Sequence, residues 1–116
     1  ASNTIIIADD AFYDCEHLTS LTIGNSVRYI GNNTFQHCYG LTSVEIPNSV
    51  YSIGSNAFFD CINVQTATLG TSVTFLGGSA FAACRGLESV TFKVQSSIFY
   101  GGTPLRVNAH NIFNTS

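Results

Sequence analysis

The sequence repeats itself every 23 residues. Four cysteines follow one another at that interval, and a phenylalanine stands three positions before each of them. A spacing kept in so many columns indicates an internal repeat, and one copy is too short to bury its own apolar side chains. The copies must therefore stack, so that their apolar side chains form one continuous interior. The residues in the two columns are Cys15, Cys38, Cys61 and Cys84, and Phe12, Phe35, Phe58 and Phe81.

Each copy contains a stretch in which apolar and small polar residues alternate, as in residues 41–46 (LTSVEI). Alternation with a period of two predicts a strand with one buried face. Equivalent strands of successive copies are expected to pair in parallel, about 4.8 Å apart. A turn follows each strand, as at residues 47–49 (PNS), and then a second short extended segment with inward-pointing Val and Ile.

Two further segments complete the copy. A glycine, Gly31, Gly54 or Gly77, follows the second extended segment and is expected to let the backbone reverse. The residues before each cysteine are too few for a stable α-helix. We expect a 3₁₀ turn or one irregular helical turn there.

The repeated pattern is L-x-x-[LV]-x-I-[PG]-[NT]-S-V-x-x-[IL]-G-x-x-[AT]-F-x-x-C, which residues 41–61 follow throughout. It resembles the leucine-rich repeats of the BspA-like, Treponema pallidum-type family, and the resemblance covers residues 5–93. Proteins with such repeats are typically exported or held at the cell surface of host-associated bacteria and some parasitic protists. Several resemble adhesins that bind host matrix proteins or other cells. The resemblance therefore implies an extracellular or cell-surface location.

The predicted fold class is a repeat solenoid of the leucine-rich-repeat type. It is a right-handed coil, mainly β with little helix, with a parallel β-sheet on one face and short 3₁₀ or irregular segments opposite. Residues 1–93 are predicted to hold four 23-residue repeats, the first of them partial. The pattern is lost after Lys93, because Pro104 and Val107 stand where Phe and Cys would fall. Residues 94–116 are expected to form an irregular C-terminal cap or a degraded repeat.

The polar side chains of the alternating strands are expected to point outward and to form the exposed face of the sheet. That face is small, polar and nearly uncharged, with Glu45 and Lys93 as its charges. Two interpretations remain open: a docking surface that uses hydroxyl groups, or a solvated face in which threonine serves β-propensity. The candidate binding residues are Ser20, Thr22, Ser43, Glu45, Thr66, Thr68, Ser89, Thr91 and Lys93.

A second candidate surface is a patch of aromatic residues, Tyr29, Tyr51 and Phe75. Tyr29 and Phe75 share one column, two repeats apart. Exposed together, the three rings would make the kind of apolar patch that marks an interaction site. The alternative is that they pack over the loops.

The four cysteines are predicted to be free, buried thiols that form a ladder. A zinc site needs four sulfur atoms about 2.3 Å from one metal ion, whereas equivalent positions of stacked copies lie along a line about 14 Å long. Neighbouring cysteines come near disulfide distance, but parallel, equivalent side chains point the same way. We therefore expect no metal site and no disulfide, with Cys15, Cys38, Cys61 and Cys84 acting as small apolar residues.

The remaining observations restrict the class of function. The sequence contains no nucleophile elbow, no H-E-x-x-H, no G-x-G-x-x-G and no P-loop, so neither an enzyme nor a cofactor is predicted. A net charge of -3 with only 9% charged residues offers no cationic track for nucleic acid. No apolar run approaches the ~20 residues of a membrane helix, so no membrane insertion is expected.

The predicted function is a non-enzymatic protein–protein interaction or adhesion module. The expected partner is a protein, such as one of the host extracellular matrix or of a cell surface. Self-association through the open ends of the stack, a structural spacer, and an accessory module of a larger enzyme are the alternatives. The chain begins at Ala1 without an initiating Met or an apolar leader and is interpreted as a mature or excised piece.

Overall fold

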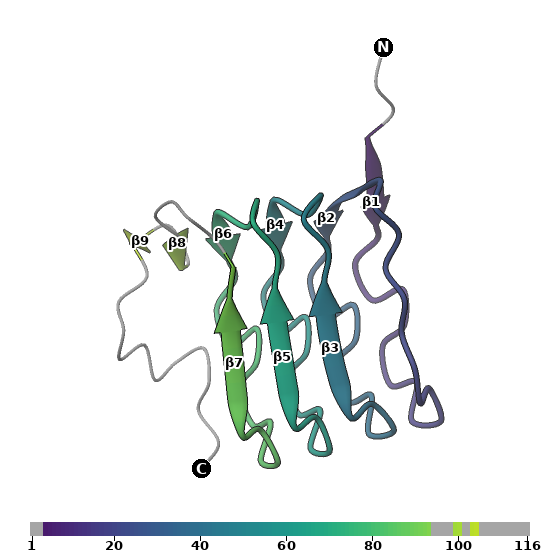
Figure 1. Cartoon of the computed structure of the whole chain (residues 1–116). Coiled ribbons are helices and arrows are strands. Elements are labelled where there is room, and N and C mark those ends of the chain that lie inside the picture. Colours follow the sequence, from purple (N-terminus) through teal and green to yellow (C-terminus); the bar gives the residue numbers. More distant parts are fainter. Residues whose placement is uncertain (1–3, 94–98, 101–102, 105–116) are drawn as a thin grey trace.

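The chain coils through two β-sheets, and successive turns of the coil lie side by side (Figure 1). The computed structural model describes residues 4–93, 99–100 and 103–104. The first sheet has the order β1-β2-β4-β6-β8-β9, and all its pairings are parallel except the last. The second sheet has the order β3-β5-β7 and is parallel throughout. The strands are β1 (Ile5–Ile7), β2 (Val27–Ile30), β3 (Ser43–Ile46), β4 (Ser52–Ile53), β5 (Thr66–Leu69), β6 (Phe75–Leu76), β7 (Ser89–Phe92), β8 (Phe99–Tyr100) and β9 (Thr103–Pro104).

The register of the strands confirms that equivalent positions lie over one another. Ile46 of β3 pairs with Leu69 of β5, which pairs with Phe92 of β7, and each step is 23 residues. Tyr29 of β2 pairs with Ser52 of β4 at the same interval. The repeat therefore forms the predicted β-solenoid, with parallel sheets and no helix among the described residues.

The phenylalanine column forms a continuous stack of rings inside the coil. Phe35, Phe58 and Phe81 are fully buried. The ring centroids of Phe35 and Phe58, and of Phe58 and Phe81, are 5.1 Å apart, with the rings nearly parallel. Phe12 stacks on Phe35 at 5.3 Å, but it is 40% exposed. The column is therefore not buried at Phe12, because that ring has a described neighbouring copy on one side only.

The segments before the cysteines are sequences of turns, and the described residues contain no 3₁₀-helix. Two residues in each copy have φ between 57° and 65°. A left-handed residue breaks the progression that a 3₁₀ or α-helical turn needs, which is why the irregular form is found. Six of the eight are Asp, Asn or His, the residue types that tolerate this conformation best. The eight are Asp10, Asp14, Asn33, His37, Asn56, Asp60, Ser79 and Ala83.

Backbone hydrogen bonds join these turn segments from copy to copy. The N–H of Phe12 donates to the carbonyl of Thr34 at 2.9 Å, and that of Phe58 to the carbonyl of Ala80 at 2.7 Å. Each such bond runs from one copy to the following copy. These bonds supply partners for buried backbone groups where the chain has no regular secondary structure.

The glycine column is needed for close packing between copies. A Cβ atom on Gly54 would lie 2.6 Å from the carbonyl carbon of Gly31 and 2.7 Å from the backbone nitrogen of Asn32. Gly31 and Gly77 would meet the preceding copy just as closely, and none of the three has a positive φ. The chain does turn directly after these glycines. The glycine is needed there for space, because a side chain of any size would push neighbouring copies apart.

The end copies differ from the inner ones. Residues 18–23 were expected to form a strand like β3, but they run beside it without regular structure at the edge of the sheet (Figure 1). At the other end Phe92, expected in the interior, is 40% exposed. Most of residues 94–116, predicted to be a cap or a degraded repeat, lie outside the described residues. No helix in the described part of the chain has the length and apolar character needed to cross a membrane.

Candidate functional site

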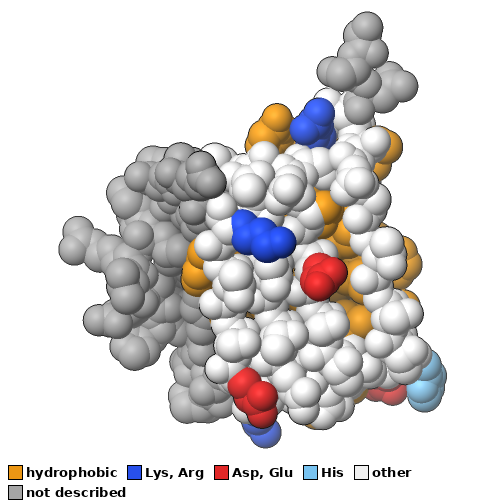
Figure 2. Space-filling model, viewed as in Figure 1, with side chains coloured by type: hydrophobic (Ala, Val, Ile, Leu, Met, Phe, Trp, Pro, Cys, Tyr) orange, Lys and Arg blue, Asp and Glu red, His pale blue; other side chains and the backbone are white. Residues whose placement is uncertain are grey.

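The outer face of the second sheet carries the polar residues singled out from the sequence. In β3 the exposed Ser43 and Glu45 alternate with the buried Val44 and Ile46. The same alternation in the other copies places eight of the nine candidate residues in exposed positions and leaves Thr68 half-buried. The face is mostly uncharged and polar (Figure 2).

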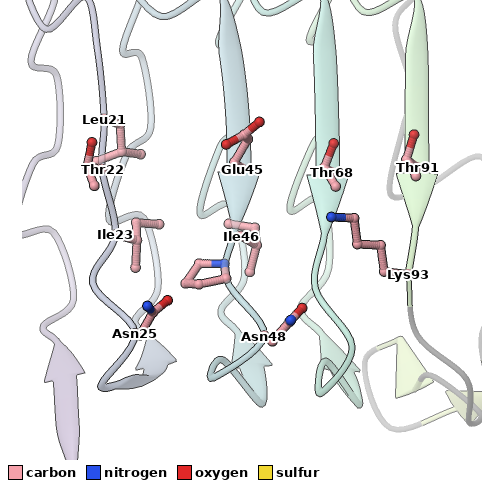
Figure 3. Close-up of a pocket in the computed structure, with 11 residues that line it drawn as sticks. Leu21, Thr22, Ile23, Asn25, Glu45, Ile46, Asn48, Thr68, Thr91 and Lys93 are labelled. Carbon is pink, nitrogen blue, oxygen red and sulfur yellow. The ribbon is translucent and has the colours of Figure 1, made fainter.

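A groove of about 450 Å³ crosses this face near the ends of the strands (Figure 3). It brings together five of the nine predicted residues, whereas Ser20, Ser43, Thr66 and Ser89 lie outside its lining. Its volume is within the range of pockets that hold small ligands or side chains. The groove is lined by Leu21, Thr22, Ile23, Asn25, Glu45, Ile46, Pro47, Asn48, Thr68, Thr91 and Lys93.

Stacking of the copies builds the centre of the groove as a row of equivalent positions. Glu45 pairs with Thr68, and Thr68 with Thr91, so these three side chains stand in register on β3, β5 and β7. Thr22 occupies the same column in the first copy, on the other side of Glu45 (Figure 3). The row presents three threonine hydroxyls and one carboxylate, and Lys93 lies beyond the end of β7.

The two asparagines and the proline of the lining were not predicted as site residues. Asn25, Pro47 and Asn48 belong to the turn that follows the strand, and the sequence assigned them to that turn alone. Asn48 has a structural role as well, because its Oδ1 accepts a hydrogen bond from the backbone N–H of Thr71 at 3.0 Å. Asn25 and Asn48 occupy the same column of successive copies, directly after the strand, and this repetition is the signal that could have placed the asparagines beside the strand ends.

The three aromatic residues of the second candidate surface lie at the first sheet, with Tyr29 in β2, Phe75 in β6 and Tyr51 directly before β4. Tyr29 and Tyr51 are 43% and 41% exposed, and their ring centroids are 6.4 Å apart. Phe75 is half-buried. The Arg28 guanidinium lies 5.2 Å from the centre of the Tyr51 ring, and Nη1 donates to the Tyr51 hydroxyl at 3.4 Å. The tyrosines are therefore brought together, in contact with a cation.

Another polar and aromatic cluster, which the sequence did not predict, connects the turns of the second and third copies. Nδ1 of His37 lies 3.0 Å from Oδ2 of Asp60, and the Tyr39 hydroxyl donates to the same oxygen at 3.3 Å. Tyr13 and Phe59 contact the His37 ring edge-to-face. Burial, together with the Asp60 carboxylate, raises the pKa of Tyr39. The polar atoms of the cluster bind one another, and these contacts join adjacent copies.

The cysteines lie in the row expected from the repeat, and none is bonded to another. Cys38, Cys61 and Cys84 are buried, whereas Cys15 in the first copy is only half-buried, so the prediction of a buried ladder is wrong for Cys15. Each buried thiol donates to the carbonyl of a phenylalanine in the preceding copy, as Cys61 does to Phe35 at 3.2 Å. Burial raises the pKa of Cys38 and of Cys84 to about 11, and it raises the pKa of Cys61 further.

The described residues contain no cluster of three or more His, Cys, Asp or Glu side chains suited to a metal ion. The lining of the groove itself offers hydroxyl and amide groups for hydrogen bonding and two separated charges.

Comparison with known families identifies the repeat. The sequence profile described as "BspA type Leucine rich repeat region (6 copies)" matches residues 1–106. The chain belongs to the BspA-type leucine-rich repeat family. Leucine-rich repeat domains of this kind generally mediate protein binding and are typically non-catalytic, and the BspA-type family is typically surface-associated.

Two solved structures of leucine-rich repeat proteins are similar to this BspA-type chain. One is the leucine-rich repeat protein of T. pallidum, with 32% sequence identity and a TM-score of 0.76 over 82% of this chain and 44% of that one. The other is a leucine-rich repeat protein from Bacteroides ovatus, with 32% identity and a TM-score of 0.71 over 73% of this chain and 22% of that one. The chain thus spans less than half the length of either protein. The comparison with curated proteins gives no match.

Proposed function

We propose that this chain is a protein-binding module that uses the groove across β3, β5 and β7. The observation that supports this most directly is the position of the groove, on the exposed face of a sheet in a family of protein-binding repeats. The groove combines apolar walls from Leu21 and Pro47 with hydroxyl, amide and charged groups. Such a mixture suits a protein surface better than a purely apolar ligand.

The module is proposed to act in adhesion, as part of a secreted or cell-surface protein. Its partner is then a protein of the host extracellular matrix or of another cell. The support for this is the typical surface association of the BspA-type family and the scarcity of charge on the sheet face, which carries no basic track for nucleic acid.

The test is a binding screen in which the groove alone is altered. The wild-type chain and a Thr68→Arg variant are compared for binding to immobilised matrix proteins and to whole cells. Thr68 stands at the centre of the row, so an arginine there fills the groove. Thr74→Arg is the matched control, because Thr74 is exposed on the side of the first sheet and does not line the groove.

We expect at least one partner that binds the wild type and the Thr74→Arg variant equally and binds the Thr68→Arg variant at least tenfold more weakly. Equal thermal unfolding midpoints of the two variants would show that the loss does not come from unfolding. If no matrix protein or cell type bound better than an unrelated solenoid, the adhesion proposal would be wrong. A partner that bound the wild type and the Thr68→Arg variant with equal affinity would show that the binding surface lies outside the groove.

The end of the stack at the first copy favours self-association as a second candidate function. Ile6 on the edge strand β1 is 61% exposed, and the Phe12 ring is stacked on one face only. An exposed edge strand with apolar side chains is a template for pairing with another chain. Light scattering at increasing concentration tests this: we expect association in the wild type, reduced by Ile6→Lys but not by Thr74→Lys. A wild-type monomer at high concentration would exclude it.

A further inference from the structure

The groove carries one acidic and one basic side chain on opposite sides of its middle strand. Glu45 lies on β3 and Lys93 follows the end of β7, with β5 between them. The Lys93 side chain extends from its own strand toward β5, and thus toward the part of the groove that holds Glu45 (Figure 3). Both residues are exposed, and neither forms a salt bridge with another residue in the described part of the chain. Each therefore offers an unneutralised charge to a ligand.

The separation of these charges sets the spacing of complementary charges on a ligand. Glu45 is in register with Thr68 and Thr91, and Lys93 stands two residues beyond Thr91. Two strand spacings of about 4.8 Å across and about 6.8 Å along the strand anchor Glu45 and Lys93 roughly 12 Å from each other. The direction of the Lys93 side chain shortens the distance between the charged groups themselves. In an extended peptide, residues two positions apart point to the same face with their Cα atoms about 6.8 Å apart. A basic and an acidic side chain at such positions match the two charges of the groove.

The uncharged groups of the groove favour an extended segment over a helix. The hydroxyls of Thr22, Thr68 and Thr91 form no hydrogen bond with another described side chain or backbone group, and the Asn48 amide nitrogen is also available. An extended peptide has backbone N–H and C=O groups to pair with these side chains, whereas a helix bonds its own backbone internally. The row of threonines across the strands thus fits the main chain of a peptide that crosses them.

We propose that the groove takes an extended segment of a partner protein that presents one basic and one acidic side chain two residues apart. The basic side chain lies against Glu45 and the acidic one against Lys93. This inference rests on the proposed function, because it specifies which partner the same groove selects. Neither charge alone determines the partner: a segment that is only acidic or only basic leaves one charge of the groove unmatched.

The test is selection from a random dodecapeptide library displayed on phage, with the wild-type chain and the Thr68→Arg variant as immobilised targets. We expect peptides that bind the wild type but not the variant, with Lys or Arg two positions from Asp or Glu more often than in the unselected library. Groove-dependent peptides without this pair would overturn the inference and leave the proposed function standing. No groove-dependent peptide at all would overturn both.

The affinity of one selected peptide, synthesised alone, then measures each charge. Glu45→Gln and Lys93→Met are each expected to weaken its binding about two- to fivefold, as exposed ion pairs do. Glu88→Gln and Arg85→Met are the matched controls, since both residues are exposed and lie outside the groove lining. Equal affinity of the wild type and both groove variants would overturn the inference, as would an equal loss in the control variants.

Discussion

Replacing one ring of the phenylalanine stack tests whether the copies depend on one another for stability. Phe58 is fully buried between Phe35 and Phe81, with ring centroids 5.1 Å away on either side. Offset stacked rings contribute about 0.5–1.5 kcal/mol per pair beyond their burial. Phe58→Leu removes two such contacts and leaves a small cavity, so we expect the free energy of unfolding to fall by about 2–4 kcal/mol.

Phe12 offers a matched comparison within the same chain. It makes one stacked contact, at 5.3 Å, and is 40% exposed. Phe12→Leu is therefore expected to cost about 1–2 kcal/mol, roughly half as much. In thermal unfolding these values correspond to midpoint shifts of roughly 8–16 °C for Phe58→Leu and 4–8 °C for Phe12→Leu.

Urea unfolding, monitored by circular dichroism, measures the free energy of unfolding of both variants. The slope of this free energy with urea concentration is compared with that of the wild type, to check that a single transition is retained. A Phe12→Leu variant as destabilised as Phe58→Leu would refute the reasoning, because the number of neighbouring rings would then not determine the cost. A Phe58→Leu variant of wild-type stability would refute it more directly.

Three further predictions concern the glycine and cysteine columns. Gly54→Ala is expected to lower the free energy of unfolding by about 1–3 kcal/mol, since its Cβ would meet the backbone of the preceding copy at 2.6 Å. Gly24→Ala, where a Cβ meets nothing within 4 Å, should change it by less than about 1 kcal/mol; equal effects in urea unfolding would contradict the packing argument. In thiol titration without reductant, the buried cysteines should react slowly in the folded chain, and all four should react after unfolding; fewer than four would indicate a disulfide. Because burial raises the pKa of Cys38 and Cys84 to about 11, the unfolded chain loses these protons first as the pH rises above about 9. The free energy of unfolding should therefore fall between pH 9 and pH 11, and it should fall less in the Cys38→Ala variant. A thermal unfolding midpoint that stayed constant over that range would contradict the assigned burial.

The sequence was sufficient to predict the fold because one interval recurs in many columns. Once the 23-residue period is recognised, alternation within residues 41–46 determines which side chains are buried, and the structure has Val44 and Ile46 inside with Ser43 and Glu45 outside. The departures occur where a copy has a described neighbour on one side only, as at Phe12 and Cys15. A pattern within one copy carries no information about whether another copy covers it.

The groove and the turn cluster were harder to predict, for two physical reasons. The groove beside Pro47 and Asn48 depends on how the turns lie against the strands of neighbouring copies. From the sequence, the turn residues were considered only for their local conformation. The contact between His37 and Asp60 joins positions of the same column in adjacent copies. The pattern within one copy does not show that a side chain will meet the residue of its own column one repeat away, so this contact was not predicted.

The direction of the hydrogen bonds between turn segments gives the first copy a row of backbone acceptors. Because each turn donates to the following one, the carbonyls of Asp9, Ala11 and Tyr13 in the first copy receive no backbone N–H from another described residue. Two molecules that brought these turn segments together would set acceptor against acceptor, so a symmetric contact through the turns is disfavoured. Only a surface that supplies donors can complete the row, so the partner of this end must differ from the end itself.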